Sequence, residues 1–217
     1  MTTSADGVAP TRKARAELTR KRLLAAAIEQ FARLSFDDVA ASDIAEQAGV
    51  AHGVLFHHFG SKRGIFLEAM RETARRLDAG HAKARDLPAG ERARAWLDAH
   101  FRFLAEHRDL SLRLVLGGRG SDPEAWAVFD ELRWRTQRDW CETLGVDSSN
   151  PAIKLMIRAA GTAVDDASAR WLEDGEPYDI PAMIEASIEL LAAGIRGAAQ
   201  LDPSLDVATA VALLARR

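Results

Sequence analysis

Three of the chain's six histidines lie within seven residues of one another, in the segment AGVAHGVLFHHFGSK at residues 48–62. An imidazole can bind a metal ion, act as a general base, or hydrogen-bond an acidic group such as a phosphate. The aromatic residues between the histidines and the lysine after them add stacking surface and positive charge. The segment therefore has three chemical interpretations, and its spacing helps to separate them.

The spacing argues against a metal or catalytic site. In a helix, the adjacent His57 and His58 point about 100° apart, and neither has the partner four residues away that a helical zinc pair needs. The nearby hydroxyl of Ser61 is better explained as the N-cap of the following helix than as a nucleophile. We therefore expect no metal, no cofactor and no enzymatic activity.

The elements around this segment form the pattern of a helix-turn-helix. Apolar residues recur at helical spacing almost everywhere, and no stretch alternates for long enough to indicate a strand, so we predict an all-α fold. We expect a first helix at about residues 16–34, a short one at 41–48 and a third over the histidines, with Gly49 capping the second. In such a unit the second short helix enters the DNA major groove.

Charge divides the chain into two unlike halves. Residues 1–85 hold fourteen Lys and Arg against ten Asp and Glu, and the remainder holds fifteen against twenty-two, although the net charge is only −3. The two halves are therefore expected to meet different partners. With 47% hydrophobic residues, one cysteine and no long uncharged apolar run, the chain should be a folded cytoplasmic protein without a disulfide framework, signal peptide or membrane helix.

The residues of this segment resemble the DNA-binding domain of the TetR family of transcriptional regulators, over about residues 23–70. The matching residues are Asp43-Ile44-Ala45, Ala48-Gly49-Val50 and Gly53-x-Leu55-Phe56-x-His58-Phe59-x-x-Lys62. The resemblance implies an N-terminal three-helix domain that binds DNA and a C-terminal helical domain that dimerises and holds a small molecule. We therefore expect a sequence-specific repressor that a small hydrophobic or aromatic ligand releases from a palindromic operator. The alternative is a DNA-binding regulator of the same fold without a small-molecule effector.

The candidate DNA contacts lie around the start of the expected third helix. The resemblance places His52 and Val54 at base edges, and Gly53 would let the backbone approach the groove. Lys62 is expected to contact a phosphate, and His58 either a phosphate or the domain interior. The full candidate set is Ser42, His52, Gly53, Val54, Phe56, His57, His58 and Lys62. The basic stretch at residues 12–22 is a second candidate surface, or simply a solvated helix start.

The sequence departs from the family pattern at several positions that usually carry other residues. Alanines at positions 40, 41 and 51 and phenylalanine at 56 stand where the family commonly has hydroxyl side chains, and Ser35 replaces a common glycine. Each missing N-cap hydroxyl removes roughly 1 kcal/mol of helix stabilisation. We expect Ser42 to cap the second helix one residue late.

The second half should consist of further helices that start at proline-containing capping signals such as Asn150-Pro151 and Asp202-Pro203. We place them at about residues 91–107, 110–116, 123–144, 151–173, 181–200 and 203–216. The predicted organisation is a flexible basic arm at 1–15, a helix-turn-helix domain at 16–61, a linking helix at 62–84, and an effector-binding and dimerisation domain at 85–217.

A ligand pocket is expected among the helices between residues 91 and 144, which hold four of the five tryptophans. The candidate lining residues are Trp96, His100, Phe103, Arg113, Trp126, Phe129, Arg133, Gln137, Trp140 and Asp165. A catalytic pair of Asp165 and Asp166 is disfavoured, because adjacent residues on a helix diverge.

The homodimer interface is expected on apolar stripes of the last two long helices, although core packing within one chain explains these stripes about as well. The stripes comprise Ile153, Met156, Ile157, Ala160, Val164 and Trp171 on one helix and Ile184, Ile188, Leu191 and Ile195 on the other.

Overall fold

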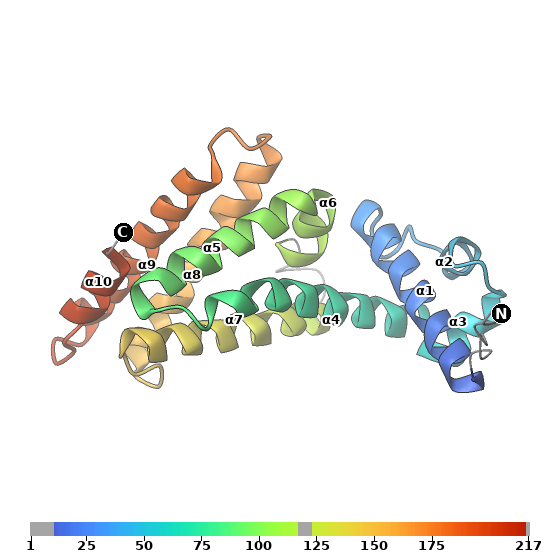
Figure 1. Ribbon diagram of the computed structural model, residues 1–217, viewed down its shortest axis with the longest axis horizontal. Coiled ribbons are helices and arrows are strands. Elements are labelled where there is room, and N and C mark those ends of the chain that lie inside the picture. Colours follow the sequence, from blue (N-terminus) through green and yellow to red (C-terminus); the bar gives the residue numbers. More distant parts are fainter. Residues whose placement is uncertain (1–10, 117–122, 216–217) are drawn as a thin grey trace, which may run out of the picture. The chain divides into compact units, whose positions relative to one another are not determined.

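The computed structural model describes residues 11–116 and 123–215, and every regular element in these ranges is a helix (Figure 1). The all-α prediction is confirmed. The chain divides into two compact units, of which one ends at Ala69 and the other begins at Met70. Within the described ranges, no helix is both long and apolar enough to cross a membrane.

The N-terminal unit contains α1 (Arg12–Arg33), α2 (Ala41–Gln47), α3 (His52–Phe59) and the start of α4 (Lys62–His81). Its core contains the side chains of Leu23, Ile44, Leu55 and Ile65, which are all fully buried. The ring of Phe66 meets that of Phe31 edge-on at 4.9 Å. Residues from each of these helices thus share one small core, which fixes the short α3 against the longer α1 and α4.

In the N-terminal unit, the start of α1 and the cap of α2 differ from the expectation. Helix α1 begins at Arg12 rather than about residue 16, because the Thr11 hydroxyl accepts a hydrogen bond from the Ala14 amide at 3.2 Å and caps the helix. The expected arm at residues 1–15 is therefore helical from Arg12 onward, and its first ten residues lie outside the described ranges. The late cap at Ser42 is wrong: α2 starts after Ala40 without a side-chain cap, and the Ser42 hydroxyl donates to Asp43 instead.

The C-terminal unit holds the rest of α4 and the helices that follow it. These are η1 (Ala82–Ala84), α5 (Ala89–Glu106), α6 (Arg108–Leu110), the π-helical turn η2 (Ser111–Val115), α7 (Pro123–Leu144), α8 (Pro151–Glu173), α9 (Ile180–Leu201) and α10 (Ala208–Ala215). Helices α8 and α9 lie side by side (Figure 1). They approach closely at Gly194, where a Cβ would lie 2.8 Å from the Cβ of Ala160.

Helix α10 begins at Ala208, five residues later than the Asp202-Pro203 pattern predicted. Asp202 stabilises a turn instead of a helix start, since its Oδ1 accepts from the amide and the hydroxyl of Ser204. Asp206 then accepts from the Ala208 amide at 3.1 Å, at the start of the helix. A capping residue before proline therefore marked a helix at Asn150 and a turn at Asp202.

The apolar stripes expected to form the dimer interface are largely buried inside the single chain. Ile153, Ile157 and Trp171 of α8 and Ile188 and Ile195 of α9 all belong to the core of the C-terminal unit. Placing the interface on these stripes was therefore wrong. An interface on these two helices has to use their outward faces.

Candidate functional site

Helix α3 presents the histidine segment on the surface of the N-terminal unit. His52, Gly53 and His57 are exposed, and Val54 is half-buried. Leu55 is fully buried, as expected, and anchors the helix from beneath. The ring of His52 packs edge-on against that of Phe56, with 4.9 Å between their centroids. The start of α3 therefore offers an imidazole, bare backbone and methyl groups to an external partner.

The turn before α3 and the side chains beside it hold this surface in place. Gly49 adopts the left-handed conformation with φ of 64°, as predicted for the end of α2, and its carbonyl accepts from the Arg22 guanidinium at 3.3 Å. Arg20 lies 5.1 Å above the centroid of the half-buried Phe59 ring and pairs with Glu68 at 3.3 Å. Two of the basic residues of α1 thus position α3 within the N-terminal unit.

Lys62 has a structural role that the sequence did not reveal. Its Nζ donates to the carbonyl of Val39 at 2.8 Å and to that of Asp37 at 3.4 Å, and it lies 4.5 Å above the Phe36 ring. Lys62 therefore ties the start of α4 to the loop between α1 and α2. Ser61 caps the same helix as predicted, since its Oγ accepts from the Gly64 amide at 2.9 Å. The predicted phosphate contact of Lys62 stays a prediction.

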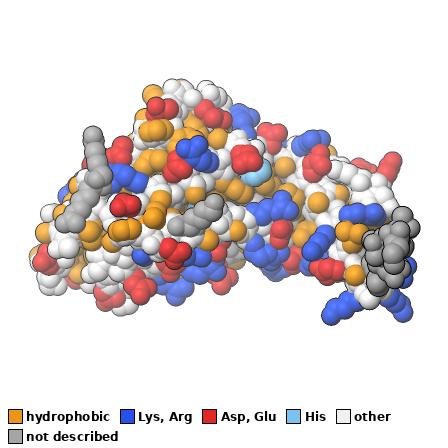
Figure 2. Space-filling model, viewed as in Figure 1, with side chains coloured by type: hydrophobic (Ala, Val, Ile, Leu, Met, Phe, Trp, Pro, Cys, Tyr) orange, Lys and Arg blue, Asp and Glu red, His pale blue; other side chains and the backbone are white. Residues whose placement is uncertain are grey.

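The remaining candidate DNA contacts lie on the same unit. Ser42 and Phe56 are exposed, and His58 is half-buried with its ring 6.2 Å from that of Phe59. The first turn of α1 adds the exposed side chains of Arg12 and Lys13. Lys and Arg side chains protrude at the lower right of Figure 2, where Figure 1 draws the start of α1.

The C-terminal unit contains a cavity with a volume of about 90 Å³, lined by residues of α4, α5, α7, α8, α9 and η2. Seven of the ten candidate ligand-binding residues line it: Trp96, His100, Phe129, Arg133, Gln137, Trp140 and Asp165. The lining also includes His81 and Thr136, which sequence reasoning missed. His81 lies on the helix interpreted only as a linker, and its buried position depends on packing against α5.

Three candidate ligand-binding residues do not line the cavity. Phe103 packs edge-on against His107 at 4.7 Å, and the side chain of Arg113 is exposed. Trp126 lies 4.6 Å from the guanidinium of Arg133 and therefore supports a lining residue. Placing these three at the cavity was wrong, because helical spacing does not say which side of a helix faces a cavity.

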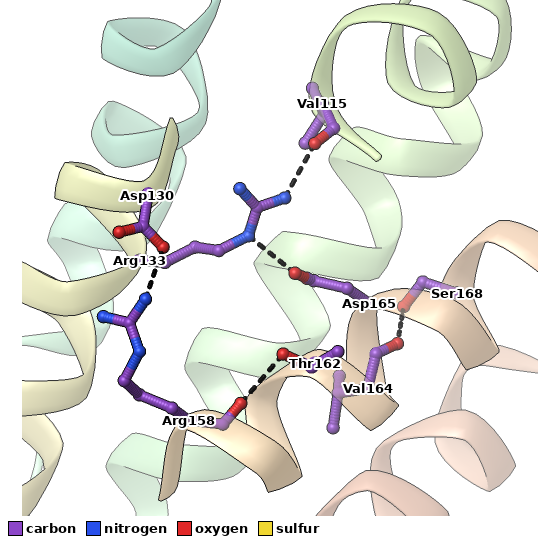
Figure 3. A network of polar contacts seen from close by, with 8 residues as sticks. All are labelled: Val115, Asp130, Arg133, Arg158, Thr162, Val164, Asp165 and Ser168. Atoms are coloured by element: carbon purple, nitrogen blue, oxygen red, sulfur yellow. Dashed lines mark hydrogen bonds and ion pairs between the residues drawn. The ribbon is translucent and has the colours of Figure 1, made fainter. Parts of the chain in front are cut away.

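Arg133 is the centre of a polar network at the cavity (Figure 3). Its Nε donates to Asp165 at 2.6 Å, and its Nη2 donates to the carbonyl of Val115 at 2.8 Å. Arg158 and Asp130 form a second ion pair between α8 and α7 at 2.8 Å. The Arg133–Asp165 pair joins α7 to α8 at the cavity with balanced charges, and the hydrogen bond to Val115 adds η2.

Two buried histidines lie beside this network. His81 is 2% exposed and His100 is 4% exposed, and their rings are 5.8 Å apart. Burial lowers the pKa of His81 to about 4, with a smaller contribution from charge repulsion by Arg85. Burial lowers the pKa of His100 to about 3, with smaller contributions from charge repulsion by His81 and Arg133. Both rings are therefore neutral near pH 7. Among the described residues, no group of three or more His, Cys, Asp or Glu side chains is placed to hold a metal.

Known proteins resemble both the N-terminal unit and the chain as a whole. Residues 23–69 match the family model described as "Bacterial regulatory proteins, tetR family". The chain is 28% identical over 185 residues to the fatty acid metabolism regulator protein of Bacillus subtilis (strain 168), covering 80% of this chain and 94% of that protein.

Solved structures show the same fold over both units. A tetR-family transcriptional regulator from Streptomyces coelicolor aligns with a TM-score of 0.76 at 23% identity, over 93% of this chain and 90% of that one. The transcriptional regulator FadR from Bacillus subtilis, in complex with stearoyl-CoA, aligns with a TM-score of 0.63 at 21% identity, over 80% and 98% of the two chains. The motif resemblance is thus confirmed: residues 23–69 match the DNA-binding domain of the TetR family of bacterial regulatory proteins, and both units have the fold of TetR-family transcriptional regulators.

Proposed function

We propose that this regulator binds a palindromic operator as a homodimer, represses transcription there, and is released when a small apolar or aromatic molecule occupies the cavity of the C-terminal unit. The observation that carries the proposal is the cavity itself. Its apolar walls and few convergent polar groups have the chemistry of a small-molecule site. The exposed start of α3 supplies the surface for base edges.

Helix α4 supports a coupling between ligand and DNA. It begins in the N-terminal unit, and its last turns contribute Leu77 and His81 to the cavity lining. A ligand that prefers one position of these last turns therefore biases a helix that also forms part of the DNA-binding unit. The proposed mechanism is a population shift toward a dimer geometry whose recognition helices no longer match two half-sites.

The outward faces of α8 and α9 support the homodimer. Leu155 on α8 is 60% exposed, and Leu190 and Leu201 on α9 are 37% and 57% exposed. Ala159 on α8 and Ala193 on α9 are also exposed. Exposed apolar side chains on two neighbouring helices are typical of an interface. We therefore assign the dimer contact to these faces in place of the buried stripes.

Selection of bound sequences from random DNA, followed by binding measurements with and without ligands, tests the proposed function. We expect a two-fold symmetric site, and we expect the ligand and the operator to weaken each other's binding by the same factor. Binding to a defined site with no response to any cavity ligand would favour the alternative, a regulator without an effector.

Charge substitution tests the dimer separately. Leu155→Glu combined with Leu190→Glu should yield monomers in analytical ultracentrifugation, whereas Tyr178→Glu, at an exposed position outside these helices, should leave the dimer intact. A dimer that survives the double substitution would contradict the assigned faces.

A further inference from the structure

The cavity is lined by buried polar atoms that have no hydrogen-bond partner among the residues the structure describes. They are both ring nitrogens of His81, both ring nitrogens of His100, Nη1 of Arg133 and Oε1 of Gln137. Buried polar groups in folded proteins are nearly always paired, because an unpaired one loses its hydration without compensation. Several unpaired atoms around one cavity therefore point to a ligand that completes them.

These four side chains form one cluster, which we call the polar cluster. The imidazole of His100 lies 5.8 Å from that of His81, and the Arg133 charge is close enough to disfavour protonation of His100. Gln137 follows Arg133 by one turn of α7, so the two share a helix face. Gly161 of α8 makes room for the Gln137 amide, since a Cβ there would lie 2.5 Å from its Nε2.

The unpaired atoms require both donors and acceptors from a ligand. Each neutral imidazole offers one N–H donor and one acceptor nitrogen, Gln137 Oε1 only accepts, and Arg133 Nη1 only donates. A carboxylate or a thioester carbonyl can only accept, so it would leave the acceptor atoms of His81, His100 and Gln137 unpaired. A hydroxyl group can donate to one of these acceptors and accept from a neighbouring N–H.

Charge and shape restrict the ligand further. The positive charge of Arg133 is already balanced by Asp165 at 2.6 Å, and the two histidines are neutral, so a buried anion would lack a counter-charge. The apolar wall combines aliphatic side chains with the aromatic rings of Trp96, Phe129 and Trp140. Trp96 stacks on His100 with 5.0 Å between centroids and meets Trp140 edge-on at 5.3 Å. These stacked rings favour a flat aromatic body on their side of the cavity.

We propose that the effector is an uncharged aromatic compound bearing at least one hydroxyl group, bound with that hydroxyl at the polar cluster of His81, His100, Arg133 and Gln137. This inference rests on the proposed function, because it names the ligand class of the same cavity. An aromatic alcohol of this kind differs in class from the stearoyl-CoA bound by FadR of Bacillus subtilis.

Calorimetric titration of the full-length protein without DNA tests the ligand class. The probes are 2-naphthol, the isosteric 2-methylnaphthalene, the anion 2-naphthoate, and stearoyl-CoA. We expect 2-naphthol to bind about ten- to a hundredfold more tightly than 2-methylnaphthalene, because the methyl group leaves the cluster unpaired. Equal affinity of these two probes, tighter binding of 2-naphthoate or stearoyl-CoA, or no binding of any probe would overturn the inference.

Two variants locate the hydroxyl site. His100→Phe and, separately, Gln137→Leu should remove most of the preference for 2-naphthol while 2-methylnaphthalene still binds. Arg113→Gln, exposed and outside the cavity, is the matched control and should keep the full preference. Circular dichroism checks that each variant is folded, and Gln137→Leu provides the test if His100→Phe is not. An undiminished preference in a folded variant would overturn the assignment to the cluster.

Measurements of operator binding distinguish failure of this inference from failure of the proposed function. If 2-naphthol binds with the expected preference but never weakens operator binding, the ligand class stands and the proposed release fails. If only stearoyl-CoA releases the DNA, the ligand-dependent release of the proposed function stands and the ligand class is wrong.

Discussion

The histidines of the two units have opposite environments. On α3 of the N-terminal unit, His52 and His57 are exposed and His58 is half-buried. In the C-terminal unit, His81 and His100 are buried beside the cavity and have no hydrogen-bond partner among the described residues. The same side chain therefore faces solvent in one unit and an internal cavity in the other. Burial, rather than residue type, assigns the role.

The cationic side chains of the two units also differ in what they contact. In the N-terminal unit Lys62 and Arg22 donate to backbone carbonyls and hold loops in place, with part of their surface still in contact with solvent. In the C-terminal unit Arg133 is balanced by Asp165 and leaves one buried nitrogen unpaired. In one unit these cations thus hold backbone carbonyls, whereas in the other a carboxylate neutralises the cation at the cavity.

The largest expected effect tests how the surface of α3 is anchored. Leu55→Ala removes a fully buried side chain from the small core of the N-terminal unit and should lower its free energy of unfolding by about 2–5 kcal/mol. Phe56→Ala, at a neighbouring position that is 39% exposed, should cost under about 1 kcal/mol. Hydrogen exchange of the α1 to α3 amides measures both. Equal losses would show that α3 is not anchored through Leu55.

The next effect is a pH dependence of the unfolding free energy, which the two buried histidines should cause. Their pKa values of about 4 and about 3 lie below the ordinary value of about 6.5, so the unfolded chain binds more protons in this window. Stability should be fully present above pH 6.5 and fall as the pH drops toward 4, by on the order of 2–4 kcal/mol at pH 5. Denaturant unfolding at several pH values measures the change. The double substitution His81→Phe and His100→Phe should flatten the profile, and an unchanged slope would contradict the role of these two groups.

A smaller effect distinguishes His52, which is expected to contact a base, from Lys62, which also stabilises the fold. His52→Ala should relax preference at one base position in each half-site by about 1–3 kcal/mol without changing thermal stability. Lys62→Ala should weaken binding to all sequences alike and also lower the melting temperature, because two loop carbonyls lose their donor. Binding measurements over a set of operator variants check both substitutions. The reverse pattern would overturn these roles.

The smallest effect compares helix caps in the two units. Helix α3 follows Ala51 without a side-chain cap, whereas Asn150 caps α8 by accepting from the amides of Ala152 and Ile153. Ala51→Ser should stabilise the N-terminal unit by about 1 kcal/mol, and Asn150→Ala should destabilise the C-terminal unit by about the same amount. Thermal unfolding measures both. No gain from Ala51→Ser would show that the start of α3 does not need a side-chain cap.

The sequence by itself determined the elements that depend on local patterns. The helix-turn-helix, the left-handed Gly49, the Ser61 cap and the bounds of α7 and α8 follow from periodicity and capping residues, and the structure confirms them. The family resemblance followed from spaced residues within one short stretch, because a helix-turn-helix is encoded by neighbouring positions. The late start of α10 was missed because Asp-Pro also begins turns.

Only the tertiary structure decided which side of each helix faces inward. The apolar stripes of α8 and α9 suit a core and an interface equally well in sequence, and packing within one chain buries them. His81 joined the cavity because its ring packs against Trp96 of α5, and Lys62 became a loop anchor because residues more than twenty positions earlier fold against it. Periodicity specifies a helical face, but the partner of that face is set by contacts between residues far apart in the chain.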